Sequence, residues 1–257
     1  MDLGLTGRRA IVTGGSKGIG RAVAAELVAE GARVAICSRK LADLEQAATE
    51  IGGSVFVQAA DVTDAGDIER FVAAAAGAMG GVDVLVNNAG GANPGNFETL
   101  TDEDWHRDLD TKLFSQIRCF RATLPHLRRS PAPRVININA VYARYPDPAF
   151  FSTTVNRAAC LNLNKVLAQE FGAENILVNS VNIGFVETPQ WRTIHQRRAP
   201  AIAFGTFLHG LAADEVPLGR FGTVQEVSAV VAFLASARAS YITGAVIDVA
   251  GGMGKYV

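Results

Sequence analysis

Short runs of apolar and β-branched residues alternate along the chain with longer segments whose apolar positions recur at helical spacing. The expected strands are residues 10–13, 33–38, 54–59, 82–87, 134–139, 176–182 and 246–249. The expected helices between them are residues 18–30, 41–51, 64–79, 101–129, 152–171 and 224–236. This alternation is typical of repeated βαβ units with right-handed crossovers. It predicts an α/β fold with a doubly wound parallel sheet and helices on both faces.

Two helix starts carry a capping box, in which Thr101 pairs with Asp104 and Thr223 pairs with Glu226. No repeat or low-complexity linker interrupts the chain, so residues 1–257 are interpreted as one domain. One long irregular segment, 185–220, remains. A connection of that length in a compact domain is usually functional or contains small helices, so we expect a substrate lid there.

Composition narrows the classes of partner. Hydrophobic residues make up 49% of the 257 residues, charged residues 19%, and the net charge is -1. The missing basic excess argues against nucleic-acid or membrane binding and favours a small molecule. The three cysteines show no metal-ligand or disulfide spacing, so we expect reduced thiols and no bound metal. The chain start lacks a signal-peptide pattern, which favours a cytoplasmic protein.

The first expected strand runs directly into a glycine-rich turn and then a helix. Gly14 suits a tight turn, Gly18 a close backbone approach to a pyrophosphate, and Gly20 close packing of helix on sheet. The amides of the helix start would attract the phosphates. A tight structural turn is the alternative interpretation. The motif predicts a Rossmann-type dinucleotide site built from Gly14, Ser16, Lys17, Gly18, Ile19 and Gly20.

The end of the second strand indicates which dinucleotide binds. An NAD site usually has an acidic residue there for the ribose 2′-hydroxyl, whereas this chain has Ser38 and Arg39. Arg39, with Lys17 from the glycine turn, suits a 2′-phosphate. The alternative is that both cations are solvated surface charges. The pattern favours NADP(H) over NAD(H).

The chain resembles the short-chain dehydrogenase/reductase family over nearly its whole length. The matching segments are TGGSKGIG at 13–20, AADV at 59–62, NNAG at 87–90, VNSVNIG at 178–184, ETP at 187–189, VPLGRFG at 216–222 and SYITGAVIDVAGG at 240–252. The resemblance implies that Asp61 and Val62 hold adenine, that Asn88, Ala89 and Gly90 line the ribose and stabilise the sheet, and that Thr188 meets the nicotinamide. Each has a structural alternative: Asp61 could end a strand, residues 88–90 could form a turn, and Thr188 could be an ordinary loop residue. The resemblance also implies that the chain forms a homo-oligomer, either a tetramer or a dimer.

The family's catalytic pattern is changed at four positions. Members usually carry Asn on the fourth helix, Ser after the fifth strand, and then Tyr and Lys four residues apart. Aligned on this pattern, the chain has Lys112, Ala140, Thr153 and Arg157. An aliphatic hydroxyl is a much weaker acid than a phenol, so Thr153 is not expected to replace the Tyr. Arg157 keeps a positive charge and can still hold the nicotinamide ribose.

Replacement proton donors lie close by in the sequence. Tyr142 and Tyr145 follow Ala140 by two and five residues, and either phenol could reach the substrate; aromatic packing is the alternative. Lys112 could pair with a substrate anion, carry a proton, or extend its amine to solvent. Four residues of the lid, Arg192, His195, Arg197 and Arg198, form a basic cluster that suits an anionic substrate or a solvated helix face.

Three functions fit these observations. The leading hypothesis is an NADP(H)-dependent oxidoreductase with a non-standard proton donor, which transfers a hydride to or from a small organic carbonyl or enone. The second is a non-catalytic NADP(H)-binding sensor or inactive partner subunit, since the glycine turn is intact beside a changed catalytic set. The third is a non-redox lyase or isomerase on the same scaffold.

Overall fold

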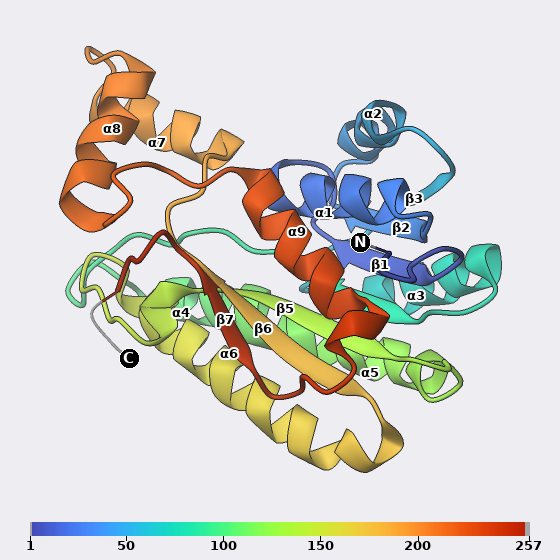
Figure 1. Cartoon of the computed structure of the whole chain (residues 1–257). Helices are drawn as coiled ribbons and strands as arrows, with labels where there is room; N and C mark the ends of the chain where they lie inside the picture. Colours follow the sequence, from blue (N-terminus) through green and yellow to red (C-terminus); the bar gives the residue numbers. More distant parts are fainter. Residues whose placement is uncertain (1, 255–257) are drawn as a thin grey trace.

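The computed structural model describes residues 2–254 and contains one seven-stranded sheet (Figure 1). All strand pairs are parallel, and the spatial order is β3-β2-β1-β4-β5-β6-β7. The strands are β1 (Arg9–Thr13), β2 (Arg33–Ser38), β3 (Val55–Ala59), β4 (Val84–Asn87), β5 (Arg134–Ala140), β6 (Leu177–Ile183) and β7 (Val246–Val249). The doubly wound α/β prediction is confirmed. The order reverses between β1 and β4, and such a switch point opens a crevice at the carboxyl ends of the strands.

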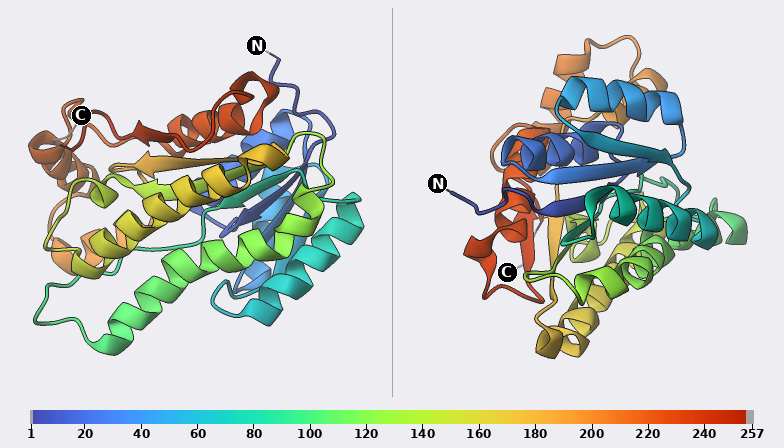
Figure 2. Two further views of the ribbon diagram at one scale, coloured as in Figure 1. Left: turned by 90° about the horizontal axis from the view of Figure 1, so that it is seen from below. Right: turned by 90° about the vertical axis from the view of Figure 1, so that its right-hand side faces the viewer.

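Helices cover both faces of the sheet (Figure 2). They are α1 (Gly18–Ala29), α2 (Leu41–Ile51), α3 (Ala65–Met79), α4 (Asp102–Leu109), α5 (Ser115–Leu127), α6 (Phe151–Glu170), α7 (Pro189–Arg198), α8 (Phe204–Glu215) and α9 (Val224–Ala235). Short 3₁₀ turns follow β5, α6 and α9 at Val141–Ala143, Gly172–Glu174 and Ala237–Ala239. Both predicted capping boxes are present, at the starts of α4 and α9.

Side chains alternate between two hydrophobic cores along each strand. Ile11, Leu85 and Val135 pack with α3, α5 and α6 on one face. Their neighbours Val12, Val86 and Ile136 pack with α1, α2 and α9 on the other face. Both faces of the central sheet are therefore buried, which is why β1, β2 and β4 read as nearly continuous apolar runs.

The predicted helix 101–129 is not one regular helix. A π-helical turn, η1 (Asp110–Phe114), separates α4 from α5, so the helical path continues with a wider turn in its middle. Hydrophobic periodicity does not reveal such a turn, because both flanking segments keep a helical period. π turns are frequent at functional sites, and this one contains Lys112.

The segment predicted as an irregular lid contains two helices, α7 and α8, which form a lobe at the upper left of Figure 1. Side chains from both helices join them: the Arg192 guanidinium lies over the Phe204 ring at 4.6 Å, and the His195 ring contacts Phe204 and Phe207. His195 Nε2 is also 2.6 Å from the Ile202 carbonyl oxygen. Two members of the predicted basic cluster thus hold the lobe together.

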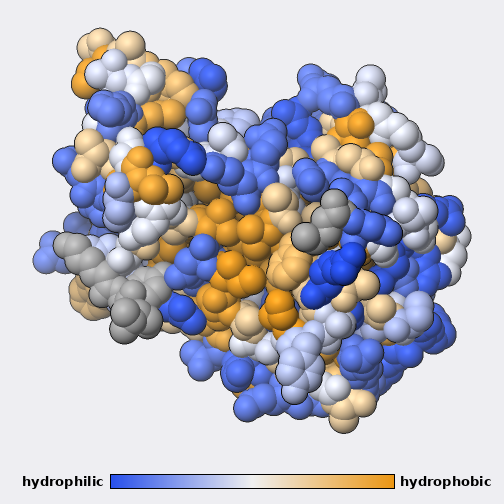
Figure 3. Space-filling model, in the orientation of Figure 1, coloured by the Kyte–Doolittle hydropathy of each residue, from blue (hydrophilic) through white to orange (hydrophobic). Residues whose placement is uncertain are grey.

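Hydrophobic residues gather in the middle of the face shown in Figure 3, over α9 and β7. Partly buried residues of these two elements include Val224, Val230, Phe233, Ile247 and Val249. An apolar surface of this kind is suited to contact with another chain, and the expected homo-oligomer stays a prediction. Within residues 2–254 no helix is both long and apolar enough to cross a membrane, and no cluster of metal-binding side chains occurs. The three cysteines are buried and unpaired.

Candidate functional site

The glycine turn forms a cradle between β1 and α1. Gly14 and Gly18 have φ of 66° and 54°, in the left-handed region that glycine adopts without strain. A Cβ at Gly20 would lie 2.3 Å from the Gly14 carbonyl oxygen, so α1 approaches the turn more closely than any side chain allows. Within the described residues, no side chain caps the start of α1 at Lys17. Its first amides are therefore available to an anionic ligand.

Asn88 fastens the end of β4 to this turn. Its Nδ2 donates to the carbonyl oxygens of Thr13 at 2.9 Å and Gly14 at 3.2 Å. The backbone N–H of Asn88 donates to the Thr13 hydroxyl at 3.0 Å. The turn is thus held in shape by hydrogen bonds across the switch point before any ligand binds.

A cavity of about 380 Å³ lies in the crevice at the carboxyl ends of the strands. It runs from the glycine turn to the residues after β5 and β6 and to the start of α7. The predicted site residues that line it are Gly14, Ser16, Lys17, Gly18, Ile19, Asn88, Ala89, Gly90, Tyr142, Arg157 and Thr188. The predicted site residues outside this lining are Gly20, Ser38, Arg39, Asp61, Val62, Lys112 and Tyr145. The cavity thus brings together most of the predicted dinucleotide site.

Arg39 and Asp61, expected at the adenine end, follow the carboxyl ends of β2 and β3. Arg39 is exposed directly after β2, and the Lys17 amine forms an ion pair with Asp43 at 2.9 Å. The Asp61 carboxylate accepts from the backbone N–H and hydroxyl of Thr63 at 2.9 and 2.8 Å. Asp61 therefore also stabilises a turn after β3, and its role toward adenine stays a prediction.

Arg157 contributes a guanidinium to the cavity wall. Its Nη1 donates to the Ile138 carbonyl oxygen at 2.9 Å, and its own carbonyl oxygen accepts from Asn139 Nδ2 at 3.1 Å. A Cβ built on Gly90 would lie 3.2 Å from Nη2. The buried Nε has no hydrogen-bond partner among the described residues. Burial lowers the pKa of Arg157 from its ordinary value, but the side chain remains a cation at neutral pH.

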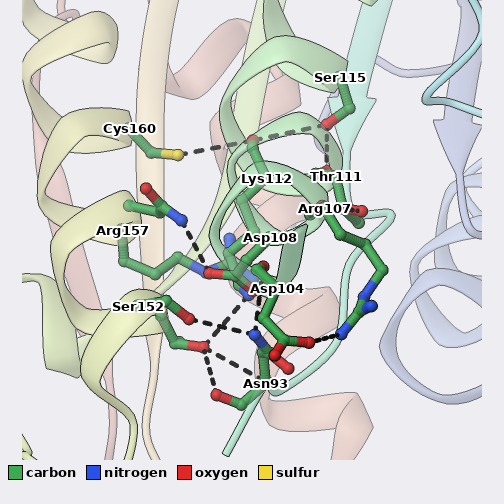
Figure 4. A network of polar contacts seen from close by, with 12 residues as sticks. Asn93, Asp104, Arg107, Asp108, Thr111, Lys112, Ser115, Ser152, Arg157 and Cys160 are labelled. Atoms are coloured by element: carbon green, nitrogen blue, oxygen red, sulfur yellow. Dashed lines mark hydrogen bonds and ion pairs between the residues drawn. The ribbon is translucent and has the colours of Figure 1, made fainter. Parts of the chain in front are cut away.

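Lys112 lies in the interior, where Figure 4 shows it between the π turn and α6. Its side chain is 1% exposed, so the alternative in which the amine reaches solvent is wrong. The amine forms an ion pair with Asp108, whose other carboxylate oxygen accepts from Asn156 Nδ2 at 2.9 Å. Burial and, second, the Arg157 charge lower the pKa of Lys112 to about 6; a neighbouring carboxylate acts in the opposite direction. Burial therefore favours the neutral form of this amine.

The Lys112 amine also contacts the cavity wall through Thr153. Lys112 Nζ is 3.2 Å from Thr153 Oγ1, which also accepts from the backbone N–H of Asn93 at 3.3 Å. Thr153 lines the cavity, so its hydroxyl connects the cavity to the buried amine. Sequence reasoning missed Asp108, Asn156 and Asn93. Asp108 is one helical turn before Lys112 and Asn156 almost one turn after Thr153, which is the signal that could have found them.

The two candidate tyrosines differ in position. The Tyr142 ring lines the cavity and stacks on Phe150 with the ring centroids 5.2 Å apart. Burial is the largest cause that raises the pKa of Tyr142 above its ordinary value. Tyr145 is absent from the described residues that line the cavity. Tyr142 therefore combines the cavity position and the aromatic packing that the sequence left as alternatives.

The chain matches known proteins over nearly its whole length. The family model described as enoyl-(acyl carrier protein) reductase matches residues 14–254. Nodulation protein G of Rhizobium sp. strain N33 is 36% identical over 249 residues, which cover 97% of this chain and 98% of that protein. The 3-oxoacyl-(acyl-carrier-protein) reductase of Salmonella typhimurium is 34% identical over 248 residues, which cover 96% of this chain and 97% of that protein.

Solved structures of two proteins are similar over the whole chain or nearly all of it. A short-chain oxidoreductase from Pseudomonas aeruginosa PAO1, described as containing an atypical catalytic centre, has 35% identity, a TM-score of 0.93 and full coverage of both chains. Its NADPH-bound form has a TM-score of 0.91 and covers 96% of this chain and 97% of that chain. L-sorbose reductase from Gluconobacter frateurii, solved with NADPH and L-sorbose, has 30% identity, a TM-score of 0.95 and full coverage of both chains. The chain belongs to the short-chain dehydrogenase/reductase family of oxidoreductases.

Proposed function

We propose that this chain is an NADP(H)-dependent oxidoreductase that acts on a small organic carbonyl or enone. The observation that carries the proposal is a single cavity that joins the glycine turn, Arg157 and the Thr153 hydroxyl. A dinucleotide that lies along the turn would place its reactive end beside a fixed cation and a hydroxyl group. When a hydride adds to a carbonyl, negative charge develops on the substrate oxygen and that oxygen takes up a proton. The cation can stabilise the charge, and the hydroxyl can pass on the proton.

The residues present fit the cofactor. The close approach at Gly20 and the uncapped start of α1 leave backbone amides for a pyrophosphate. Arg39 and Ser38, with Lys17, would hold the 2′-phosphate, and Asp61 and Val62 the adenine. Asn88, Ala89, Gly90 and Arg157 would hold the ribose near the nicotinamide, with Thr188 beside it. The NADPH-bound P. aeruginosa and G. frateurii structures support this choice. When bound, NADPH supplies the hydride.

Lys112 is the proposed source of the proton, and the Thr153 hydroxyl is proposed to relay it. The Thr153 hydroxyl passes its proton to the substrate oxygen, and the Lys112 ammonium replaces that proton across the 3.2 Å contact. Asp108 and Asn156 position the amine, while the Arg157 cation favours negative charge on the reacting oxygen. Tyr142 remains a second candidate donor because it lines the same cavity. The P. aeruginosa oxidoreductase, with its atypical catalytic centre, supports the idea that this fold works with changed residues.

The test is NADPH consumption. Purified protein is incubated with NADPH and a panel of ketones, quinones, enones and enoyl thioesters, and the loss of reduced-nicotinamide absorbance is recorded. We expect turnover with at least one uncharged carbonyl compound. Saturable NADPH binding without turnover across the whole panel would contradict the proposal.

A non-catalytic NADP(H)-binding protein is the second candidate. It is favoured by one observation: Thr153 presents an aliphatic hydroxyl, which is a weaker acid than a phenol. Binding of NADPH that changes the oligomeric state or partner binding, with no turnover, would support it. The cytoplasmic location and the homo-oligomer stay predictions.

A further inference from the structure

Two aromatic walls are among the residues that line the cavity. The first wall is Tyr142 stacked on Phe150, after β5. The second is Phe185 with Trp191, between β6 and α7, whose ring centroids are 5.1 Å apart. Both pairs line the same cavity, so a molecule bound beside either pair would have aromatic rings next to it.

The rings of each wall are fixed by contacts with other aromatic rings. The Tyr142 and Phe150 rings are nearly parallel, at 23°. Trp191 meets Phe221 edge-on at 4.9 Å, and Phe221 stacks on Phe185 at 5.1 Å. Rings fixed in this way keep a shape suited to a planar apolar body and lose little side-chain freedom when it binds.

The cavity wall carries few charged side chains. Among the described residues that line the cavity, none is Asp or Glu, and the cations are Lys17 and Arg157. Lys17 is already paired with Asp43. The nearby basic residues Arg192 and His195 pack against Phe204, so both are engaged in joining α7 to α8. Arg192 and His195 therefore serve the packing of the lobe, which makes them less suited to attract an anionic substrate.

Resting on the proposed function, we propose that the substrate is an uncharged carbonyl compound whose carbonyl is attached to an aromatic or otherwise apolar ring system. Ala140 strengthens this inference, because its methyl group offers no hydrogen bond at the wall beside Tyr142. A carboxylate or a polyol placed against the ring faces of the two walls would lose hydrogen bonds to water that the rings do not replace. An apolar ring gains burial and ring contacts with both walls.

The test uses Trp191 as a fluorescence reporter in the Trp105→Phe background. Trp105 lies on α4 and contacts Phe151, outside the cavity lining, so its removal leaves Trp191 as the reporting indole. The protein is saturated with NADP⁺ and titrated with acetophenone, with 4-acetylbenzoate, which adds only a carboxylate, and with L-sorbose. We expect acetophenone to bind at least tenfold more tightly than the other two. In the otherwise native protein, calorimetry with Trp191→Ala should show acetophenone binding weakened several-fold with NADP⁺ affinity unchanged.

The outcomes separate this inference from the proposed function. If the protein binds NADP⁺ but binds 4-acetylbenzoate or L-sorbose as tightly as acetophenone or more tightly, the substrate inference alone is overturned. The same holds if the protein binds NADP⁺ but does not bind acetophenone. Failure to bind NADP⁺ or NADPH would instead overturn the proposed function. Unchanged acetophenone affinity in Trp191→Ala would remove the second wall from the substrate site.

Discussion

The amine of Lys112 lies 3.2 Å from the hydroxyl oxygen of Thr153, although the two residues are 41 positions apart in the sequence. Lys112 lies in the interior and Thr153 lines the cavity, so the contact gives a buried titratable group access to the site. General acids and bases work best when their pKa lies near the operating pH. A lysine whose pKa is lowered to about 6 meets that requirement.

Removing the Thr153 hydroxyl should abolish most of the turnover. Thr153→Val keeps the shape but loses the proton path, so kcat should fall by about 10² or more, the usual contribution of a general acid. NADPH affinity, measured by calorimetry, should not change. Thr153→Ser is the matched control and should keep most of the activity. If Tyr142→Phe is inactive and Thr153→Val is not, Tyr142 is the donor instead.

Carbonyl reduction should depend on the protonation of Lys112. The ammonium is the donor form, so kcat should fall as the pH rises through the folded-state pKa of about 6. Lys112→Met should be slow and should lack this transition between pH values of about 5 and 8. The measurement is kcat against pH at saturating NADPH. A transition that persists in Lys112→Met would assign it to another group.

The same lysine should affect stability in a pH-dependent way. Its pKa is lowered from 10.5 to about 6 in the folded protein, so between these values the unfolded chain binds more protons at this site. The Lys112 contribution therefore makes the free energy of unfolding rise with pH across that window. The free energy of unfolding is measured by urea unfolding at several pH values for the native protein and for Lys112→Met. The difference between their slopes against pH gives the contribution of Lys112. Equal slopes would contradict a lowered pKa.

The glycine turn should not tolerate a side chain on α1. Gly20→Ala would place a Cβ 2.3 Å from the Gly14 carbonyl oxygen and 2.4 Å from Asn88 Nδ2. We expect a loss of about 1–3 kcal/mol in stability, the usual effect of overpacking, and loss of NADPH binding. Gly77→Ala on α3 is the control, since its Cβ would meet nothing within 4 Å. The free energy of unfolding of Gly77→Ala, measured in urea, should rise by about 0.5–1 kcal/mol. This variant should bind NADPH normally.

Cofactor choice should follow the charge at residue 39. Arg39→Asp would repel the 2′-phosphate and could accept a hydrogen bond from a ribose hydroxyl, so the affinity ratio should shift from NADPH toward NADH. Arg129→Asp makes the same charge change on the exposed turn after α5 and should leave the ratio unaltered. The ratio of dissociation constants from calorimetry is the measurement. An unchanged ratio in Arg39→Asp would defeat this role of Arg39.

The amino-acid sequence by itself determined the class of fold and most of the cofactor crevice. Apolar runs buried on both faces of a parallel sheet, and Gly14 and Gly20 at a strand-to-helix turn, are local signals, because periodicity and glycine geometry act over a few residues. The tertiary structure decided how the residues of the catalytic region are arranged. From the sequence, Lys112 could reach solvent, pair with an anion or carry a proton. The packing of α4, the π turn and α6 around its side chain excludes the first of these. Burial, the Asp108 pair and the Thr153 contact depend on distant segments packed together, and no local pattern records them.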